Sequence, residues 1–128
     1  MADVTTLRRL ALALPDVEEG TAYGTPAWRV RKKLFARLRD DRETVAVRVD
    51  RGERELLIGA EPDVFFITDH YRAYAWVLVR LAAIPEDELA EVLEDSWRRA
   101  APKRLVRARD EQTGRSAAGR GGAAGAAG

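Results

Sequence analysis

The sequence predicts an α+β fold, in which an antiparallel β-sheet lies between one helix near each end of the chain. Apolar residues recur at helical spacing in residues 5–14 and 86–100, whereas they alternate with polar residues between residues 27 and 50. The length of 128 residues fits a single domain. Hydrophobic residues at 46% and charged residues at 34% are typical of a folded globular chain.

The first helix is expected over residues 5–14. Its apolar stripe consists of Leu7, Leu10, Ala11 and Leu14. Asp3 or Thr5 can cap its N-terminus, and Pro15 would end it.

The alternating segment is expected to form an antiparallel meander. Its strands are predicted at 28–31, 34–39 and 44–49, with turns at 32–33 and 40–43. The preceding residues 16–26 contain two glycines and a proline, so we expect a loop there, with a short strand around Tyr23.

Alternation also assigns the faces of these strands, because successive side chains point to opposite sides of a sheet. One side carries Leu34, Ala36 and Leu38, and on the next strand Val45, Val47 and Val49. The opposite side carries Arg37, Arg39 and Arg48, while Arg29 and Arg31 share one face of their own strand. Whether these arginines meet depends on the register, which alternation leaves open.

Clustered arginines on one sheet face need compensation, since like charges directly across a sheet destabilise it. Two interpretations are open. The cluster contacts an anionic partner, or acids interleave with it, for which Asp40, Asp41 and Glu43 are the candidates.

The second half of the chain adds a short helix, two strands and the last helix. The expected elements are a helix at 51–58, a strand at 64–68, a loop at 69–72, a buried strand at 76–81 and a helix at 86–100. Pro102 ends the last helix, and residues 103–111 are expected to add a helical turn or two.

The domain organisation follows from a change in composition near the C-terminus. From Gly114 on, the last fifteen residues contain six glycines and six alanines and no large apolar side chain. Such a segment cannot bury enough surface to offset the entropy of ordering. We therefore expect one domain over residues 1–112 and a disordered tail over residues 113–128.

Composition restricts the chemistry of the chain. It contains no cysteine and one histidine, His70, which excludes disulfides, thiolate metal sites and mechanisms that use two histidines. Asp69 adjoins His70, but neighbours in a loop do not by themselves make a base and its orienting group. Ser96 lies on the apolar stripe of the last helix, where a packing role is expected. We predict no enzymatic activity, no metal and no cofactor.

The formal net charge of +1 is unevenly distributed. Residues 1–97 hold 14 Lys/Arg and 19 Asp/Glu, a net of −5, and residues 98–128 hold 8 and 2, a net of +6. Residues 29–39 contain six basic residues and no acid. A basic end on an acidic body indicates an anionic partner, although arginines in a solvated tail would produce the same charge.

Several short motifs together resemble the MmcQ/YjbR family of small bacterial proteins. They are Leu14-Pro15, residues 24–28, residues 33–36, residues 62–66, His70-Tyr71, Trp76-Val77, Glu88-Leu89, Ser96-Trp97 and residues 101–105. Each motif is weak alone, but their order and spacing over about residues 4–106 are specific.

The resemblance implies a frataxin-like (CyaY-like) two-layer sandwich, with the N- and C-terminal helices packed on one face of the antiparallel sheet. It also implies DNA binding, through similarity to a double-wing architecture that lays a sheet on duplex DNA, and it brings no invariant catalytic motif. The fold likeness also raises iron binding, because frataxin-like proteins bind iron with acidic residues on the first helix and the adjoining strand. Residues 5–14 contain no acid and two arginines, so iron handling is not expected.

We therefore predict binding of double-stranded DNA without sequence specificity, through phosphate contacts of the sheet face and of a flexible basic arm. The sheet-face candidates are Arg29, Arg31, Lys32, Lys33, Arg37, Arg39 and Arg48, and those of the arm are Lys103, Arg104, Arg107 and Arg109.

The alternative is a protein-interaction or small-ligand module that uses the sheet face or the region of Trp28, Tyr71 and Tyr74, and exposed rings would favour it. The N-terminus lacks the features of a signal peptide, and no apolar run is long enough to span a membrane. A cytoplasmic monomer is expected.

Overall fold

The computed structural model describes residues 2–114 and confirms the α+β class. One six-stranded sheet runs in the order β1-β2-β3-β4-β6-β5, and all neighbouring strands are antiparallel. The strands are β1 Val17–Ala22, β2 Thr25–Val30, β3 Lys33–Leu38, β4 Thr44–Arg48, β5 Phe65–Phe66 and β6 Trp76–Arg80. The helices are α1 Val4–Leu12, α2 Arg51–Ala60, α3 Glu86–Ala100 and α4 Lys103–Thr113, with 3₁₀ turns at Asp69–Tyr71 and Leu81–Ala83.

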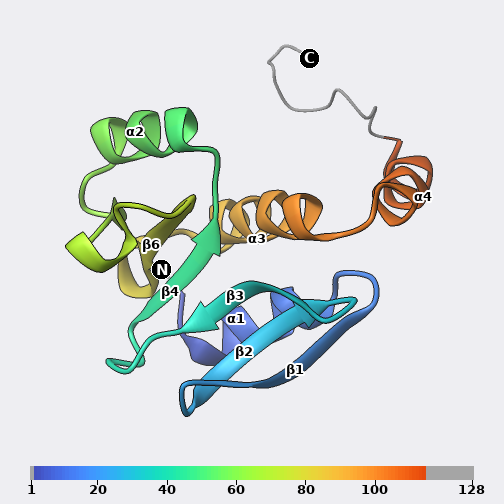
Figure 1. Cartoon of the computed structure of the whole chain (residues 1–128), viewed down its shortest axis with the longest axis horizontal. Coiled ribbons are helices and arrows are strands. Elements are labelled where there is room, and N and C mark those ends of the chain that lie inside the picture. The colour runs from blue at the N-terminus through green and yellow to red at the C-terminus, as the bar shows by residue number, and fades with distance from the viewer. Residues whose placement is uncertain (1, 115–128) are drawn as a thin grey trace.

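Helices α1 and α3 pack on the same face of the sheet, which confirms the expected two-layer arrangement (Figure 1). We call this the core face and the opposite side the outer face. The largest fully buried side chains are Trp28 of β2 and Trp97 of α3. Trp28 Nε1 donates to Glu19 Oε1 at 3.1 Å, and Trp97 Nε1 donates to the Pro15 carbonyl at 2.9 Å. The second bond ties α3 to the residue at which the first helix was expected to end.

Helix α1 begins where the sequence places its cap. The Asp3 carboxylate accepts a hydrogen bond from the Thr6 amide at 2.9 Å, so Asp3 is the N-cap and Thr5 lies within the helix. Leu7 and Ala11 are buried on the stripe. The helix ends at Leu12, two residues earlier than expected.

The loop expected over residues 16–26 is wrong, because most of it is the edge strand β1. This strand pairs with β2 along its whole length, and most of its side chains are exposed. The β1–β2 turn needs Tyr23 and Gly24 at φ of 56° and 83°. Positive φ at both central residues matches the twist of a two-residue hairpin, and glycine adopts it without strain.

The expected grouping of Leu34 with Ala36 and Leu38 is also wrong. The register between β2 and β3 shifts between Trp28 and Arg29, so that Phe35 is an extra residue in β3. A bulge of this kind lets consecutive side chains point to one side. Phe35 and Ala36 both enter the core, and Leu34 turns to the outer face.

The remaining elements agree with prediction in type and differ in length. Helix α2 is capped by Asp50 and extends to Ala60, whereas the strand expected at 64–68 is reduced to β5. The expected tail, 113–128, lies outside the described residues from 115 on, and its first two residues end α4. Among the helices of residues 2–114, none has the length and apolar character needed to cross a membrane.

Candidate functional site

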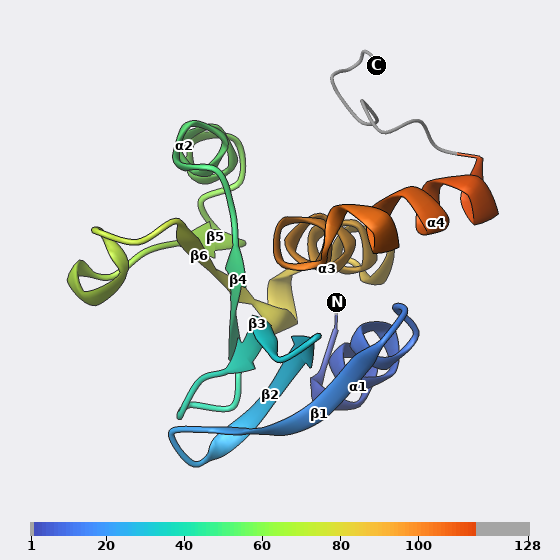
Figure 2. The same cartoon turned by 45° about the vertical axis from the view of Figure 1, so that its right-hand side comes forward.

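The outer face of the sheet carries a hollow of about 460 Å³. Side chains of β3, β4 and β6 line it together with the β1–β2 turn and the segment between β5 and β6. The lining residues are Tyr23, Leu34, Arg37, Arg39, Asp40, Ala46, His70, Tyr71, Tyr74 and Trp76. Figure 2 shows the segment between β5 and β6 to the left of β4, whereas α3 and α4 lie to its right. The hollow is therefore on the side that the helices leave uncovered, and it combines cations with aromatic rings.

Arg37 is a largely buried cation of the hollow. Its guanidinium carbon is 5.0 Å from the centre of the Tyr23 ring, a cation–π distance. Its Nε donates to the Ala22 carbonyl at 3.1 Å, and Nη2 is 3.4 Å from Asp40 Oδ1. Only 13% of the Arg37 side chain is exposed, and its contacts attach the β1–β2 turn to β3.

Arg39 is better placed than Arg37 to bind an anion from solution. Its guanidinium carbon lies 5.5 Å from the centre of the Tyr71 ring, and it has no carboxylate within 4 Å among the described residues. The positive charge of Arg39 acts on the nearby Asp41 carboxyl. Burial alone would raise the pKa of the Asp41 carboxyl, but hydrogen bonds from Glu43 and Thr44 and the charge of Arg39 lower that pKa below its usual value. Arg39 can therefore pair with an anion that enters the hollow.

Two further arginines of the outer face also stack on rings. Arg48 lies 4.9 Å from the Trp76 ring and donates from Nε to the Leu34 carbonyl at 2.6 Å, and burial lowers the pKa of its guanidinium. Arginine keeps its charge despite such a shift. Arg80 lies 4.0 Å from the Phe66 ring. The outer face is thus a layer of alternating cations and rings.

A buried arginine of α2 positions the rings that border the hollow. Arg54 is 6% exposed. Its Nη1 donates to the carbonyls of Tyr71 at 3.3 Å, Tyr74 at 2.6 Å and Trp76 at 3.1 Å, and Nη2 donates to Arg72 at 3.2 Å. One guanidinium therefore satisfies four carbonyls between the end of the 3₁₀ turn Asp69–Tyr71 and the first residue of β6.

The predicted cations of the β2–β3 hairpin are only partly free. Arg29 Nη2 donates to the Thr21 carbonyl at 3.3 Å, and Arg31 Nε pairs with Asp16 at 2.7 Å. The interleaved acid is therefore Asp16 here, and Asp40 beside Arg37. Arg31 and Lys32 form the turn with φ of 49° and 71°, and Lys32 and Lys33 are exposed.

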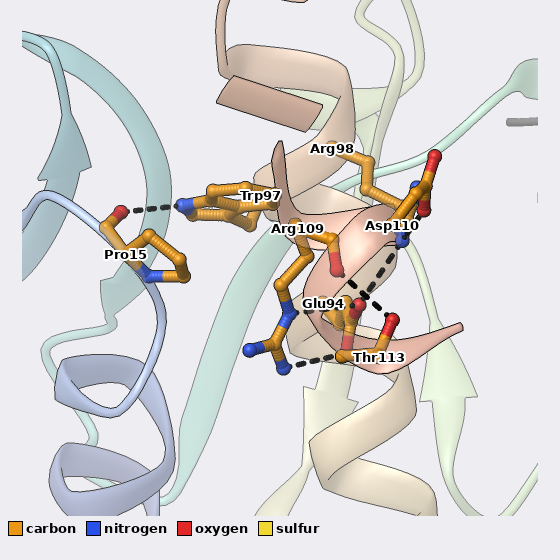
Figure 3. Close-up of polar contacts among 7 residues, drawn as sticks. All are labelled: Pro15, Glu94, Trp97, Arg98, Arg109, Asp110 and Thr113. Carbon is orange, nitrogen blue, oxygen red and sulfur yellow. Dashed lines mark hydrogen bonds and ion pairs between the residues drawn. The ribbon is translucent and has the colours of Figure 1, made fainter. Parts of the chain in front are cut away.

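The predicted basic arm is a helix that docks on α3. Arg98 of α3 pairs with the buried Asp110 at 2.5 Å and with Glu94 at 3.3 Å, and Arg109 pairs with Glu94 at 3.2 Å. Figure 3 shows these contacts converging between the two helices. The exposed cations of α4 are Lys103, Arg104 and Arg107. Because α3 covers the core face, these cations lie on the other side of the sheet from Arg37 and Arg39.

The hollow contains rings that sequence reasoning did not bring together. Trp28, which we grouped with Tyr71 and Tyr74, is in the core, and Trp76 lies beside those tyrosines instead. Tyr23 joins them from the β1–β2 turn. The one sequence feature that pointed to this cluster of rings was the presence of three aromatic residues within residues 71–76.

The two polar residues singled out for chemistry have other contacts. His70 packs edge-on against Tyr71 with ring centres 5.0 Å apart, while Asp69 pairs with Arg72 at 3.0 Å. Ser96 is fully buried, donates to the Phe35 carbonyl at 2.5 Å and accepts from the Arg48 amide at 2.8 Å. Ser96 therefore bridges the bulge in β3 to β4.

The fold and the candidate site define a class: a small α+β domain whose open sheet face carries an arginine- and ring-lined hollow. The chain matches the family model described as YjbR over residues 12–99, and it belongs to the YjbR family. It is 37% identical over 126 residues to "Uncharacterized protein Rv2570" of Mycobacterium tuberculosis and to "Uncharacterized protein Mb2600" of Mycobacterium bovis, covering 84% of this chain and 95% of each relative.

A solved structure has the same fold. The crystal structure of Deinococcus radiodurans protein DR2400, a DUF419 domain, superposes with a TM-score of 0.70 at 24% identity, covering 97% of this chain and 96% of that one.

Proposed function

We propose that the chain is a cytoplasmic, monomeric and non-enzymatic module that binds DNA through the outer face of its sheet, without sequence specificity. The observation that carries the proposal is the pairing of cations with rings on this face, where Arg39 has no carboxylate within 4 Å among residues 2–114. Arginine recognises phosphate as a planar cation and also stacks on aromatic groups. Phosphate contacts of this kind position a protein without reading sequence.

The arrangement of charge supports the outer face over α4. The cations of α4 and those of the hollow lie on opposite sides of the sheet, so one short duplex cannot lie against both. The exposed Lys32 adds a cation at the β2–β3 turn. Lys33 does not, because it pairs with Val30 of the core face and alternates with Leu34 of the outer face. We therefore assign phosphate contacts to Arg39 and Lys32.

The test is binding of a labelled duplex of about 25 base pairs, at about 50 and 200 mM salt, to the full chain. Two phosphate contacts predict a slope of about −2 in log K against log salt. Arg39→Glu is expected to weaken binding about 5- to 10-fold and to reduce that slope by about 1. Arg37 is unsuitable for charge reversal, because its buried guanidinium holds the β1–β2 turn.

Arg107→Glu is the matched control, because it makes the same change of charge on α4. It is expected to alter affinity less than about twofold, since screening removes charge effects at this range. Equal losses for Arg39→Glu and Arg107→Glu would refute the assignment to the outer face. Absence of salt-dependent binding would refute the function.

A second candidate function has its own supporting observation. A hollow of about 460 Å³ with several rings and two arginines lies within the size range of small-molecule sites. A free nucleotide tests this candidate, and it is included in the experiment below.

A further inference from the structure

We infer that the hollow on the outer face takes a single unpaired nucleobase, so that the chain binds single-stranded DNA more tightly than a duplex of the same sequence. This inference rests on the proposed function and specifies which form of DNA the site prefers. The proposed function uses only the cations of the outer face, whereas this inference also assigns a binding role to its aromatic rings.

The first argument is the exposure of two rings at the border of the hollow. Tyr23 is 88% exposed and Tyr74 is 56% exposed. They reach the hollow from opposite borders, one on the β1–β2 turn and the other in the segment before β6. Bases stack on such rings regardless of their identity, because every base has a π-face.

The second argument is that the backbone that carries each ring is fixed before any ligand binds. Tyr23 has φ of 56° in a two-residue turn, and its ring lies over the Arg37 guanidinium. The Tyr74 carbonyl accepts a hydrogen bond from Arg54 at 2.6 Å. A site whose backbone is already ordered loses less entropy when it binds.

The third argument concerns the lining between the rings. Leu34 and Ala46 supply apolar surface, and the Asp40 carboxylate, with 85% of its side chain exposed, supplies an acceptor for the N–H groups of a base. Arg39 lines the same hollow and can pair with the adjacent phosphate. Ring, acceptor and cation together are complementary to one nucleotide unit of a strand.

A duplex cannot use these groups without deformation. Its bases are stacked and paired, and a base must leave the helix to enter a pocket, which costs least when the strand is already single. The Arg37 guanidinium is also recessed below the Tyr23 ring, where a duplex phosphate does not reach. A single strand therefore gains the ring contacts, whereas a duplex keeps only the exposed cations.

The experiment compares three probes with the full chain: a labelled mixed-sequence strand of about 12 nucleotides, the duplex of the same sequence and free AMP. Fluorescence anisotropy reports affinity for the labelled DNA, and AMP is measured by competition. Trp76 lines the hollow while Trp28 and Trp97 are in the core, so quenching of tryptophan emission independently reports stacking in the hollow.

The variants remove one ring at a time. Tyr74→Ala and Tyr23→Asn are chosen because both side chains are exposed and asparagine tolerates a positive φ. Each is expected to weaken binding of the single strand about 5- to 100-fold and to leave duplex binding within about twofold. Leu56→Ala, which removes an exposed apolar side chain from α2, is the matched control and is expected to change neither.

The outcomes separate this inference from the proposed function. Tighter binding of the single strand, lost in the tyrosine variants, would support both. A duplex bound as tightly as the strand would overturn the inference and leave the proposed function intact, and no binding of either DNA would overturn both. Strand binding that ignores Tyr23→Asn and Tyr74→Ala would overturn the role of the hollow. AMP bound as tightly as the strand would replace the inference with a small-molecule site.

Discussion

Replacing Ser96 by alanine tests how the bulge in β3 is stabilised. The Ser96 hydroxyl is fully buried and serves two backbone groups at once, the Phe35 carbonyl at 2.5 Å and the Arg48 amide at 2.8 Å. The pairing of β3 with β4 ends at Ala36 and Val47, so these two groups lie just beyond the ladder and have the hydroxyl as their partner. Alanine keeps the Cβ and removes only the oxygen.

The expected cost follows from the two groups that the substitution leaves unpaired. Each buried polar group without a partner costs about 1–3 kcal/mol. Partial closure of the gap between the strands reduces the sum, so we expect Ser96→Ala to lower the free energy of unfolding by about 2–4 kcal/mol. For a domain of about 110 residues this corresponds to a decrease in Tm of about 8–15 °C.

The assay is two-state urea unfolding of the full chain, with a thermal melt as a second measurement. Thr113→Ala is the matched control, because it also removes a hydroxyl that donates to a backbone carbonyl, Arg109 at 3.0 Å, but in an exposed position. We expect it to cost less than about 0.5 kcal/mol. A loss of less than about 1 kcal/mol in Ser96→Ala would refute the reasoning, since it would mean that both backbone groups find other partners.

Three further substitutions test individual contacts. Arg54→Met should lower the free energy of unfolding by about 2–4 kcal/mol, because three carbonyls before β6 and that of Trp76 in β6 lose a buried charged donor, and it should weaken DNA binding in parallel. Asp110→Ala should speed amide hydrogen exchange throughout α4 and leave the core unchanged, because Arg98 loses the carboxylate that docks this helix. A hydrogen bond with Glu61, together with burial and neighbouring acids, raises the pKa of Glu88 to about 7 from its ordinary 4.5. The folded state then holds a proton that the unfolded state releases, so stability should fall as pH rises from 4.5 to 7, by about 1–2 kcal/mol after solvent screening, and Glu88→Gln should abolish this fall.

The Arg54 and Glu88 substitutions have matched controls on α4, and each of the three substitutions has an outcome that would contradict it. Arg104→Met and Glu111→Gln remove the same groups from exposed positions of α4 and should leave stability and its pH dependence unchanged. An unaltered Tm for Arg54→Met would contradict the conclusion that the hydrogen bonds of Arg54 stabilise the segment before β6. Unaltered exchange in Asp110→Ala would contradict the docking of α4. The stability of Glu88→Gln and of the unsubstituted chain will be compared across pH. A difference that does not vary with pH would contradict the raised pKa of Glu88.

Some contacts of the hollow could be anticipated and others could not. Alternation correctly placed Arg37 and Arg39 on the face away from Leu38, because side chains alternate along any regular strand. The position of Leu34 could not be predicted, because the extra residue at Phe35 is stabilised by Ser96, which lies 61 residues away in the chain. The rings before β6 likewise depend on Arg54, whose position in α2 carries no local sign of this role.

The sequence by itself determined the elements whose signal is local: the stripes of α1 and α3, the alternation of β2 to β4 and the apolar run of β6. Periodicity is enough there, because each segment carries the pattern of the surface it must bury. Tertiary structure alone decided that the polar residues 17–22 form an edge strand, since their pairing comes from the backbone of β2 and not from their own side chains. It also decided that α4 docks on α3 through buried ion pairs, and that rings from residues 23 and 71–76 meet the arginines of β3 in one hollow. Those contacts join residues far apart in the chain, where local spacing carries no information.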